Sequence, residues 1–446
     1  MDRNFPRNGT LAPIRGGAIL GLLVVPLGLA QAQSVDPPNT APDEPFAQRL
    51  TEAGIVLHST YLGEFASNPV GGQRHGSAYD DEFSLGATFD LGKLVGLDGG
   101  AVDVMFTNRD GTSLSADEIN NSIAVQEKYG DGQTYQLTFL TYSQKLFGGL
   151  VETSVGRDDI TFHFAFQPGA CPYFQSFAIC NNPSATLVMV NDGSSYWPES
   201  VWGGLVKVNP TPDLYAKLGV YQDRPALNPR IDHGFDWGGD HGNGVQIGAE
   251  IGYKQTEPGA ILPDQFALGT IYDVGHYNAA FFAPNPQYGR GVVYLQANQT
   301  VYRPSPDSKE GLYLLGSLYR ATEGDSQTAD YEWQIGALYF GAIPGRPDDN
   351  AAFQITGLHY TKDLLKTLFQ ERLAEGGSEF PQSSMTMAEL NYSVRPTPWL
   401  TITPNLQYVW HPDGLGALTY PTANLRNALV IGTQLEIDFD KLVGFN

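Results

Sequence analysis

The sequence from residue 209 to residue 222 is NPTPDLYAKLGVYQ, a proline-rich turn followed by a regular alternation of side chains. The alternation sets Leu214, Ala216, Leu218 and Val220 against Tyr215, Lys217, Gly219 and Tyr221. Because successive side chains of a β-strand point to opposite faces, this pattern predicts a strand with one apolar and one polar face. Proline cannot donate to a sheet ladder and presets a turn dihedral, so NPTP predicts a tight turn before the strand.

The same kind of turn occurs twice more, as RPSP at 303–306 and RPTP at 395–398. The three turns begin 94 and 92 residues apart, with a clear alternation after the first and the last and a looser one after the middle one. Further short turns are expected at 96–100, 148–149, 257–259 and 344–347. Evenly spaced turns between two-faced strands predict a long antiparallel meander.

The turns and alternations together predict sixteen strands, with seven short turns on one side and eight longer loops on the other. The expected strands are 54–64, 83–92, 100–107, 135–145, 149–157, 200–208, 213–222, 244–254, 265–273, 289–302, 311–320, 331–342, 351–361, 383–395, 399–409 and 427–439. An even number of strands of about ten residues, joined by alternately short and long connections, is typical of a bacterial outer-membrane barrel. Barrels of about sixteen strands enclose an aqueous channel, whereas barrels of about eight are filled by side chains.

The faces of the expected strands place lipid outside and water inside. In 427–439 one face carries Leu429, Ile431, Leu435, Ile437 and Phe439, and the other carries Gln434, Glu436 and Asp438. A soluble β-sandwich would also alternate, but with its apolar face inside. A β-propeller would repeat units of roughly 40–50 residues with four strands each, whereas each interval here holds two. The transmembrane all-β barrel is therefore the favoured fold class.

Composition and charge narrow the function. The chain has 51 Gly and 12% aromatic residues but only 17% charged residues, and its formal net charge is -22. Nucleic acid is not an expected partner, because an acidic protein repels phosphates. No apolar run of 18 residues follows residue 33, so membrane crossing would have to be by strands.

The first 32 residues have the three-part pattern of a signal peptide. Arg3, Arg7 and Arg15 form a basic region, 18–30 is apolar, and Ala30-Gln31-Ala32 is a small-x-small cleavage site. We therefore expect export. The expected organisation is a signal peptide at 1–32, an N-terminal periplasmic segment at 33–53, the barrel at 54–439 and a C-terminal extension at 440–446.

The loop at 158–199 is the longest one expected. It contains Cys171 and Cys180, which are predicted to form a local disulfide in an oxidising compartment. Only His163 stands near them, so a metal site is not expected. The loop is rich in aromatic residues, namely Phe162, Phe164, Phe166, Tyr173, Phe174, Phe177, Tyr196 and Trp197. The sequence leaves two placements open for it: inside the lumen, narrowing it, or on the barrel rim as a cap.

Charged, amide and aromatic side chains on the inner face are candidates for the channel lining. A sugar has apolar C–H faces and a rim of hydroxyl groups, so a sugar path would combine aromatic rings with charged or amide groups. The candidates by parity are Asp103, Arg109, Arg157, Tyr215, Lys217, Glu389 and Asn391, with Trp202 beside the long loop. In a separate loop, residues 362–373 carry leucines at helical spacing and predict a short helix at the barrel mouth.

From about residue 54 to residue 439 the chain resembles the carbohydrate-selective porins of the OprB type. The resemblance rests on the order and spacing of several short pieces. These are GG at 71–72, DLGKLVGLDGG at 90–100, GR at 156–157, CPYFQ at 171–175 with Cys180, WG at 202–203, PGRPDD at 344–349, PNLQYV at 404–409 with HP at 411–412, and NALVIG at 427–432. The resemblance implies a sixteen-stranded outer-membrane channel of a Gram-negative bacterium that admits glucose and related sugars by passive diffusion. Such barrels usually end on an aromatic residue, a place that Phe439 fills here, with seven residues after it.

Two other functions compete with the sugar channel. An outer-membrane enzyme would need a nucleophile and a histidine together at one rim, and the eight histidines stand near no nucleophile motif. A general diffusion porin, or a channel for another small polar solute, remains the alternative. The expected partners are mono- and oligosaccharides, outer-membrane lipid and lipopolysaccharide, and the barrel-insertion machinery, for a monomer or a trimer. No cofactor is expected.

Overall fold

The structure is a computed structural model. It describes residues 46–130, 133–167, 173–177, 188, 191, 194–223, 229–235, 237–238, 244–277, 287–323 and 327–445. The predicted signal peptide and the predicted disulfide between Cys171 and Cys180 lie outside the described residues.

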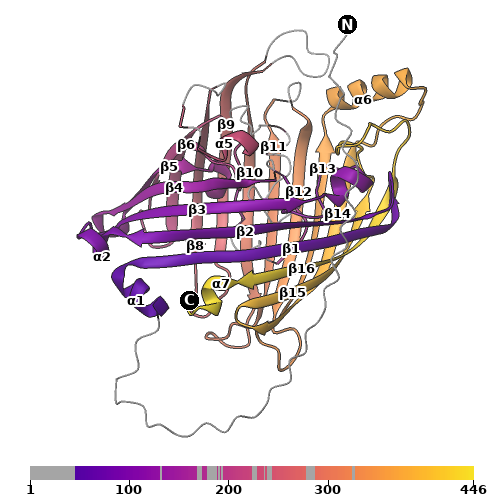
Figure 1. The fold of residues 1–446 in the computed structure, drawn as a ribbon. Coiled ribbons are helices and arrows are strands. Elements are labelled where there is room, and N and C mark those ends of the chain that lie inside the picture. The colour runs from indigo at the N-terminus through magenta and orange to yellow at the C-terminus, as the bar shows by residue number, and fades with distance from the viewer. Residues whose placement is uncertain are drawn as a thin grey trace. The chain divides into compact units, whose positions relative to one another are not determined.

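Sixteen strands of the described residues close into an antiparallel barrel, in which strands adjacent in sequence pair and β1 pairs with β16. The strands are β1 (Ile55–Gly72), β2 (Ser77–Asp90), β3 (Gly100–Gly111), β4 (Tyr135–Leu146), β5 (Val151–Asp158), β6 (Val201–Val208), β7 (Leu214–Gln222), β8 (Val245–Gln255), β9 (Asp264–Tyr277), β10 (Gln287–Tyr302), β11 (Gly311–Ala321), β12 (Ala329–Phe340), β13 (Asn350–Tyr360), β14 (Ser384–Thr397), β15 (Leu400–Trp410) and β16 (Arg426–Asp438). Each of the sixteen predicted strands overlaps one of them (Figure 1). The predicted fold class is confirmed.

The three proline-rich segments lie at the predicted turns, between β6 and β7, β10 and β11, and β14 and β15. The last of them is the tightest, because only Pro398 and Trp399 separate the two strands. In the middle turn the guanidinium of Arg303 donates hydrogen bonds to the carbonyls of Pro258 (2.8 Å) and Ser308 (2.9 Å). Arg303 thus ties its own turn to the neighbouring one between β8 and β9.

The alternation also places the faces as predicted. On β14 the side chain of Leu390 is 55% exposed on the outside, whereas Glu389 beside it is fully buried inside the barrel. On β16 Ile431 is 51% exposed and Gln434 is buried. An apolar outer surface around a more polar interior is the pattern of a barrel in a lipid bilayer.

The connection between β1 and β2 differs from the prediction, which placed a long loop there. Both strands are longer than expected, and only 73–76 lie between them. The Asn68 amide donates to the carbonyls of Gly71 (3.0 Å) and Arg74 (2.7 Å), while Gly71 has a positive φ of 80°. The register shifts between Ser67 and Gly72 break the alternation of side chains in the sequence, although β1 remains paired with β16 and with β2.

Short helices accompany the strands. They are α1 (Phe46–Ala53), α2 (Leu91–Val95), the π-helical turn η1 (Ser115–Ile119), the 3₁₀ turn η2 (Phe147–Gly149), α3 (Ile160–His163), α5 (Pro229–Asp232), α6 (Lys362–Ala374) and α7 (Phe439–Leu442). None of the helices in the described part of the chain is long and apolar enough to cross a membrane.

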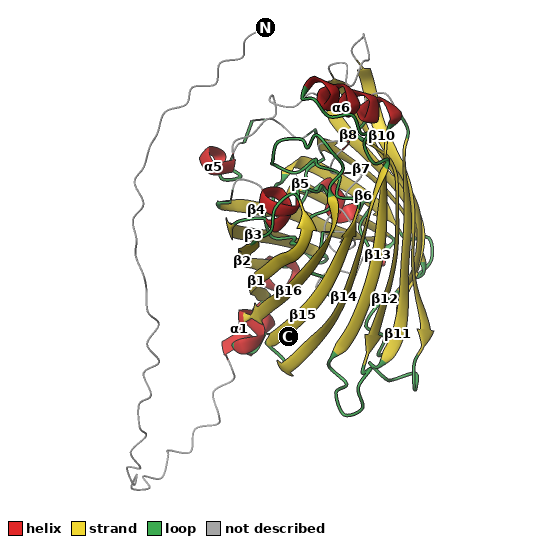
Figure 2. Ribbon diagram, turned by 90° about the vertical axis from the view of Figure 1, so that its right-hand side faces the viewer, coloured by secondary structure: helices red, strands yellow, loops and turns green. Residues whose placement is uncertain are grey.

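Helix α6 confirms the predicted helix in the loop after β13. The hydroxyl of Thr361 caps its N-terminus by accepting from the backbone N–H of Leu364. Leu364, Leu365 and Leu368 are buried on the barrel side. Figure 2 shows α6 at the end of the barrel opposite the short turns. These two ends are called the long-loop end and the short-turn end below.

Candidate functional site

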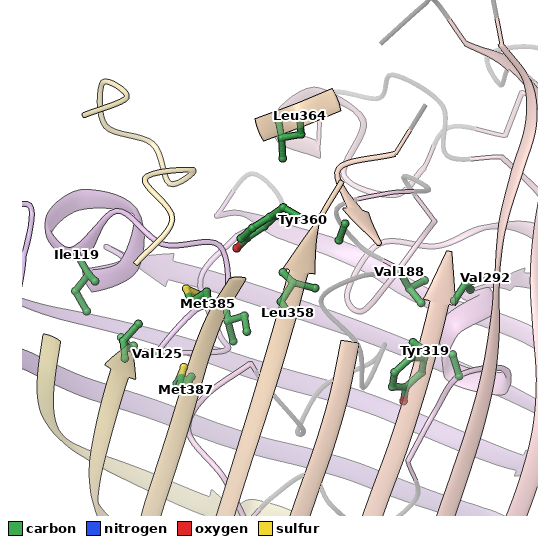
Figure 3. Close-up of a cluster of buried hydrophobic side chains, with 14 of the residues drawn as sticks. Ile119, Val125, Val188, Val292, Tyr319, Leu358, Tyr360, Leu364, Met385 and Met387 are labelled. Carbon is green, nitrogen blue, oxygen red and sulfur yellow. The ribbon is translucent and has the colours of Figure 1, made fainter. Parts of the chain in front are cut away.

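The described parts of the loop 112–134, between β3 and β4, lie inside the barrel. Its side chains Leu114, Ile119, Ile123 and Val125 are fully buried. They form one apolar cluster with inward-facing residues near the long-loop ends of β13–β16, namely Leu358, Tyr360, Met385, Met387, Val409, Ala428 and Val430. Figure 3 shows Ile119 and Val125 beside Met385 and Met387, with Leu364 of α6 above Leu358 and Tyr360. The polar inner face predicted for these strands therefore stops short of this end, where a loop covers the wall.

Polar contacts fix the same loop to the adjoining strands β1 and β2 as well. The carboxylate of Glu64 on β1 accepts hydrogen bonds from the backbone N–H groups of Glu127 (2.8 Å) and Lys128 (3.1 Å). The amide of Gln126 donates to Asp80 on β2 at 3.0 Å, and Gln407 on β15 donates to the carbonyl of Val125 at 3.0 Å. The loop is thus held along one stretch of the wall, where β2, β1, β16 and β15 are successive neighbours.

A buried charge cluster lies where this loop meets β1–β3. Arg109 forms an ion pair with Glu82 at 2.7 Å, and Glu82 also accepts a hydrogen bond from the indole of Trp197 at 2.8 Å. Within the loop, Lys128 pairs with Glu127 at 2.8 Å. Burial raises the pKa of the Glu127 carboxyl to about 7, against the opposing positive charge of Lys128.

The described parts of the loop 159–200, between β5 and β6, also lie inside the barrel. Phe164 is fully buried, and a Cβ atom added to Gly219 or Gly248 would lie within 2.8 Å of its ring. The Lys217 ammonium donates to the carbonyl of His163 at 2.5 Å. Two glycines on the inner faces of β7 and β8 thus make room for an aromatic residue of the loop.

Residues 173–177 of this loop reach the far wall. The carboxylate of Glu389 accepts hydrogen bonds from the backbone N–H groups of Gln175 and Ser176, both at 2.9 Å. Asn391 donates to the carbonyl of Tyr173 at 2.7 Å. Phe174 packs in an apolar cluster with inward-facing residues of β11–β13, namely Tyr313, Leu315, Leu338, Phe340 and Ala352. Of the two placements left open by the sequence, the structure has the described residues of the loop inside the lumen.

Between the start of the loop 159–200 and the wall of β1–β9 a cavity of about 620 Å³ remains, called the vestibule here. The strand residues that line it include His58, Thr88, Asp103, Thr141, Ser143, Lys145, Glu152, Ser154, Lys207, Tyr215, Lys217, Lys254 and Gln265. Most of these lie within a few residues of the short-turn ends of their strands. The vestibule therefore occupies the short-turn half of the barrel, and its size falls within the roughly 300–1,000 Å³ of typical ligand pockets.

Aromatic side chains line the inner end of the vestibule. Phe139 on β4 contacts Phe162 edge-on with ring centroids 5.2 Å apart, and Phe162 stacks with Phe166 at 5.4 Å. We call these three rings the aromatic roof. His163 beside them pairs with Asp158 at 2.8 Å.

Hydrogen-bonding groups line the wall below the aromatic roof. On β1–β3 the hydroxyl of Thr88 donates to Asp103 at 2.6 Å and contacts His58 at 3.0 Å. On β7 and β8, Tyr215 donates to Glu250 at 2.8 Å. The vestibule thus combines apolar ring faces with groups that can bind hydroxyls.

The structure separates the predicted site residues into several groups. Asp103, Tyr215 and Lys217 line the vestibule. Arg109 faces inward but belongs to the buried charge cluster, and Glu389 and Asn391 face inward but hold the loop 159–200.

The inner-face placement predicted for Arg157 and Trp202 is wrong. Val155, two residues before Arg157, is 59% exposed on the outside, whereas Ser154 and Asp158 of the same strand line the vestibule. Arg157 and Trp202 are register partners on β5 and β6, so both lie on the outer face. There the guanidinium of Arg157 stacks 5.9 Å from the Trp202 ring and donates to the Ser200 carbonyl at 2.6 Å.

Several vestibule residues were missed from the sequence. Lys207, Lys254 and Gln265 occupy inward-facing positions of their strands. The alternation of side chains, applied to every strand, would have identified them. The same alternation does not identify Phe139, because a register shift between β3 and β4 beside Phe139 changes which side chains of β4 face inward.

Comparisons with known proteins agree with this architecture. The family model described as "Carbohydrate-selective porin, OprB family" matches residues 74–439. Porin B of Pseudomonas aeruginosa is 29% identical over 418 residues, which cover 87% of this chain and 88% of that protein.

Solved structures agree as well. The high-pH structure of OprB from Pseudomonas putida superposes with a TM-score of 0.79 at 28% identity, covering 88% of this chain and 96% of that one. The low-pH structure of the same protein has a TM-score of 0.54 at 23% identity, over 88% of this chain and 95% of that one, and supports the fold alone. The chain belongs to the carbohydrate-selective porin family of the OprB type, whose members are β-barrel channels for carbohydrates in the outer membrane of Gram-negative bacteria.

Proposed function

We propose that monosaccharides such as glucose diffuse from the long-loop end, past the two inward-folded loops, into the vestibule and out at the short-turn end. The two loops leave little of the lumen open, which favours small sugars over large solutes. On this proposal the protein acts as a passive channel and carries out no catalysis. The observation that carries the proposal is the aromatic roof above a wall of hydrogen-bonding groups.

In this proposal the aromatic roof contacts the C–H face of the sugar ring while Asp103 and Tyr215 exchange hydrogen bonds with its hydroxyls. Aromatic rings offer an apolar surface to the C–H groups of the sugar. The carboxylate supplies hydrogen-bond acceptors for its hydroxyls, and the phenol can both donate and accept. Each contact is weak enough for the sugar to leave again, as diffusion through a channel requires. Glu389 and Asn391 contribute indirectly, since they hold the loop that supplies Phe162 and Phe166.

The test is sugar uptake by liposomes that contain the purified protein. We expect glucose to enter at least tenfold faster than a trisaccharide, and Phe162→Ala with Phe166→Ala to lower the glucose rate and reduce this discrimination. Phe380→Ala serves as the matched control, because Phe380 is 52% exposed in the loop after α6, away from the vestibule. Equal entry of glucose and the trisaccharide would support a general diffusion porin instead.

The remaining predictions about the chain belong to the same proposal. Residues 1–32 act as a signal peptide, 33–53 as a periplasmic segment, 54–439 as the barrel and 440–446 as an extension. The barrel-insertion machinery assembles the protein, whose apolar outer face contacts lipid and lipopolysaccharide. N-terminal sequencing of the outer-membrane form tests the cleavage site. Crosslinking in intact membranes decides between a monomer and a trimer.

A further inference from the structure

Three lysines gather on one wall of the vestibule, at the short-turn ends of β6–β8. Lys207 on β6 and Lys217 on β7 are direct cross-strand partners, and Lys254 on β8 lies four residues beyond Glu250, the partner of Lys217. All three line the vestibule. The ring of Tyr215 lies among them, 5.8 Å from the Lys207 ammonium and 5.3 Å from that of Lys217.

The three ammonium groups are not equally neutralised. Lys217 pairs with the buried carboxylate of Glu250 at 2.7 Å. Lys207 pairs more loosely with Glu152 at 3.4 Å, with about a third of each side chain exposed. Lys254 has no ion-pair partner among the described residues, and its nearest register partner on β9 is the uncharged Gln265. Glu152 acts electrostatically on Lys254 as well as on Lys207, so this wall carries three ammonium groups against the two carboxylates of Glu152 and Glu250.

The other acidic groups of the vestibule are engaged elsewhere. Asp103 lies on β3 and accepts the Thr88 hydroxyl, and Asp158 at the inner end pairs with His163. A chain with 48 acidic and 26 basic residues thus places three of its ten lysines together at one point of the solute path. A local positive field in a narrow cleft attracts anions even when the net charge of the protein is negative.

We infer that this wall, Lys207, Lys254, Tyr215 and Gln265, is a subsite for sugar acids, in which the two lysines bind the carboxylate and the tyrosine and glutamine bind the hydroxyls. Ammonium–carboxylate hydrogen bonds are roughly twice as strong as neutral ones, so the acid form is selected over the neutral sugar. The inference rests on the proposed sugar path and names one substrate class for it. The subsite lies at the short-turn end, where a solute leaves the vestibule for the periplasm.

The test is block of the single-channel KCl current in planar bilayers, with glucuronate and glucose as the two probes, each added on the short-turn side. We expect the half-blocking concentration of glucuronate to be at least fivefold below that of glucose, and the difference to shrink as KCl is raised, because salt screens the lysines. Lys207→Gln with Lys254→Gln should bring the two half-blocking concentrations within twofold of each other. Lys309→Gln is the matched control, since Lys309 is exposed in the short turn after β10 and does not line the vestibule.

The outcomes distinguish failure of the sugar-acid subsite from failure of the proposed sugar path. If glucose and glucuronate block the native channel equally, or if the double variant leaves the preference for glucuronate unchanged, the sugar-acid subsite is refuted while the sugar channel stands. If neither probe blocks a conducting channel, the proposed sugar path itself is refuted. Heat-modifiable migration of each variant on a detergent gel confirms that the barrel has folded, so that lost block cannot be attributed to misfolding.

Discussion

The carboxylate of Glu389 on β14 accepts a hydrogen bond from the backbone N–H of Gln175, 2.9 Å away and 214 residues earlier in the chain. A second bond comes from the N–H of Ser176 at the same distance. Because this carboxylate is buried, it has no water to replace these donors. Together with Asn391, which donates to the carbonyl of Tyr173, Glu389 therefore fixes the position of the loop segment that narrows the lumen.

We predict that Glu389→Ala releases the segment around Gln175 and Ser176. Loss of two charge-assisted hydrogen bonds costs on the order of 2–5 kcal/mol of unfolding free energy. Single-channel conductance should rise and discrimination between glucose and larger sugars should fall. Glu375→Ala, at the exposed end of α6, should change neither quantity, and an unaltered conductance in Glu389→Ala would contradict the role given to Glu389.

The contact between Phe164 and Gly248 gives a second prediction. An alanine Cβ at Gly248 would lie 2.6 Å from the Phe164 ring, so Gly248→Ala should cost about 1–3 kcal/mol of stability through overpacking. Adding Phe164→Ala removes the clash, and urea unfolding should show the double variant to be more stable than the sum of the two single effects. Gly316→Ala, where the nearest atom is 3.8 Å away, should be near neutral. If the effects of the two substitutions on the unfolding free energy simply added, Phe164 of the loop would not pack against Gly248 of β8.

A third prediction concerns the buried pair of Arg109 and Glu82. Arg109→Gln leaves Glu82 as a buried charge without its guanidinium partner and should cost roughly 3–5 kcal/mol. Adding Glu82→Gln removes that charge, so the double variant should recover part of the loss in a urea titration. Arg320→Gln, which breaks the exposed pair with Asp330, should cost about 0–1 kcal/mol. If adding Glu82→Gln lowered the unfolding free energy of Arg109→Gln further, the broken ion pair would not be the source of the lost stability.

The pH dependence of the channel gives a fourth prediction. Burial raises the pKa of Glu127 to about 7 from 4.5, so the stabilising effect of its neutral form is fully present below about pH 4.5 and is lost as the pH rises through about 7. The charged groups around Glu127 are Lys128, Glu64, Glu82 and Arg109. Cation selectivity, measured from reversal potentials, should therefore increase as the pH rises through about 7 and the carboxylate forms. Glu127→Gln should flatten this rise near pH 7, and an unchanged pH profile in that variant would assign the titration to another group.

Local sequence patterns were sufficient to predict the strands. The alternation around Tyr215 and Lys217 and the three proline-rich turns depend only on residues next to one another, and all sixteen strands were found from such signals. Failures occurred where the backbone departs from regular pairing. The Gly71-Gly72 irregularity hid the ends of β1 and β2, and the shift between β3 and β4 hid Phe139.

The candidate site could be predicted only in part. Parity on a strand gives the face of a side chain, and it placed Asp103, Tyr215, Lys217, Glu389 and Asn391 inside. It could not tell that Glu389 and Asn391 are covered by a loop, because that contact joins segments more than 200 residues apart. For Arg157 the strand phase was misjudged: Arg157 lies on the same outer face as Val155, two residues earlier, and pairs with Trp202.

The sequence by itself determined the barrel: its strand number, the order of its turns, and the division between an apolar outside and a more polar inside. These follow from the period-two alternation and from proline and glycine at the turns, which act over a few residues. Only the tertiary structure decided which inward side chains meet water. The loops 112–134 and 159–200 pack against β13–β16 and β11–β14 and cover those walls, leaving the vestibule beside β1–β9. Burial of apolar loop residues on a distant wall has no periodic signature, so the lining of the open path is a property of the folded chain.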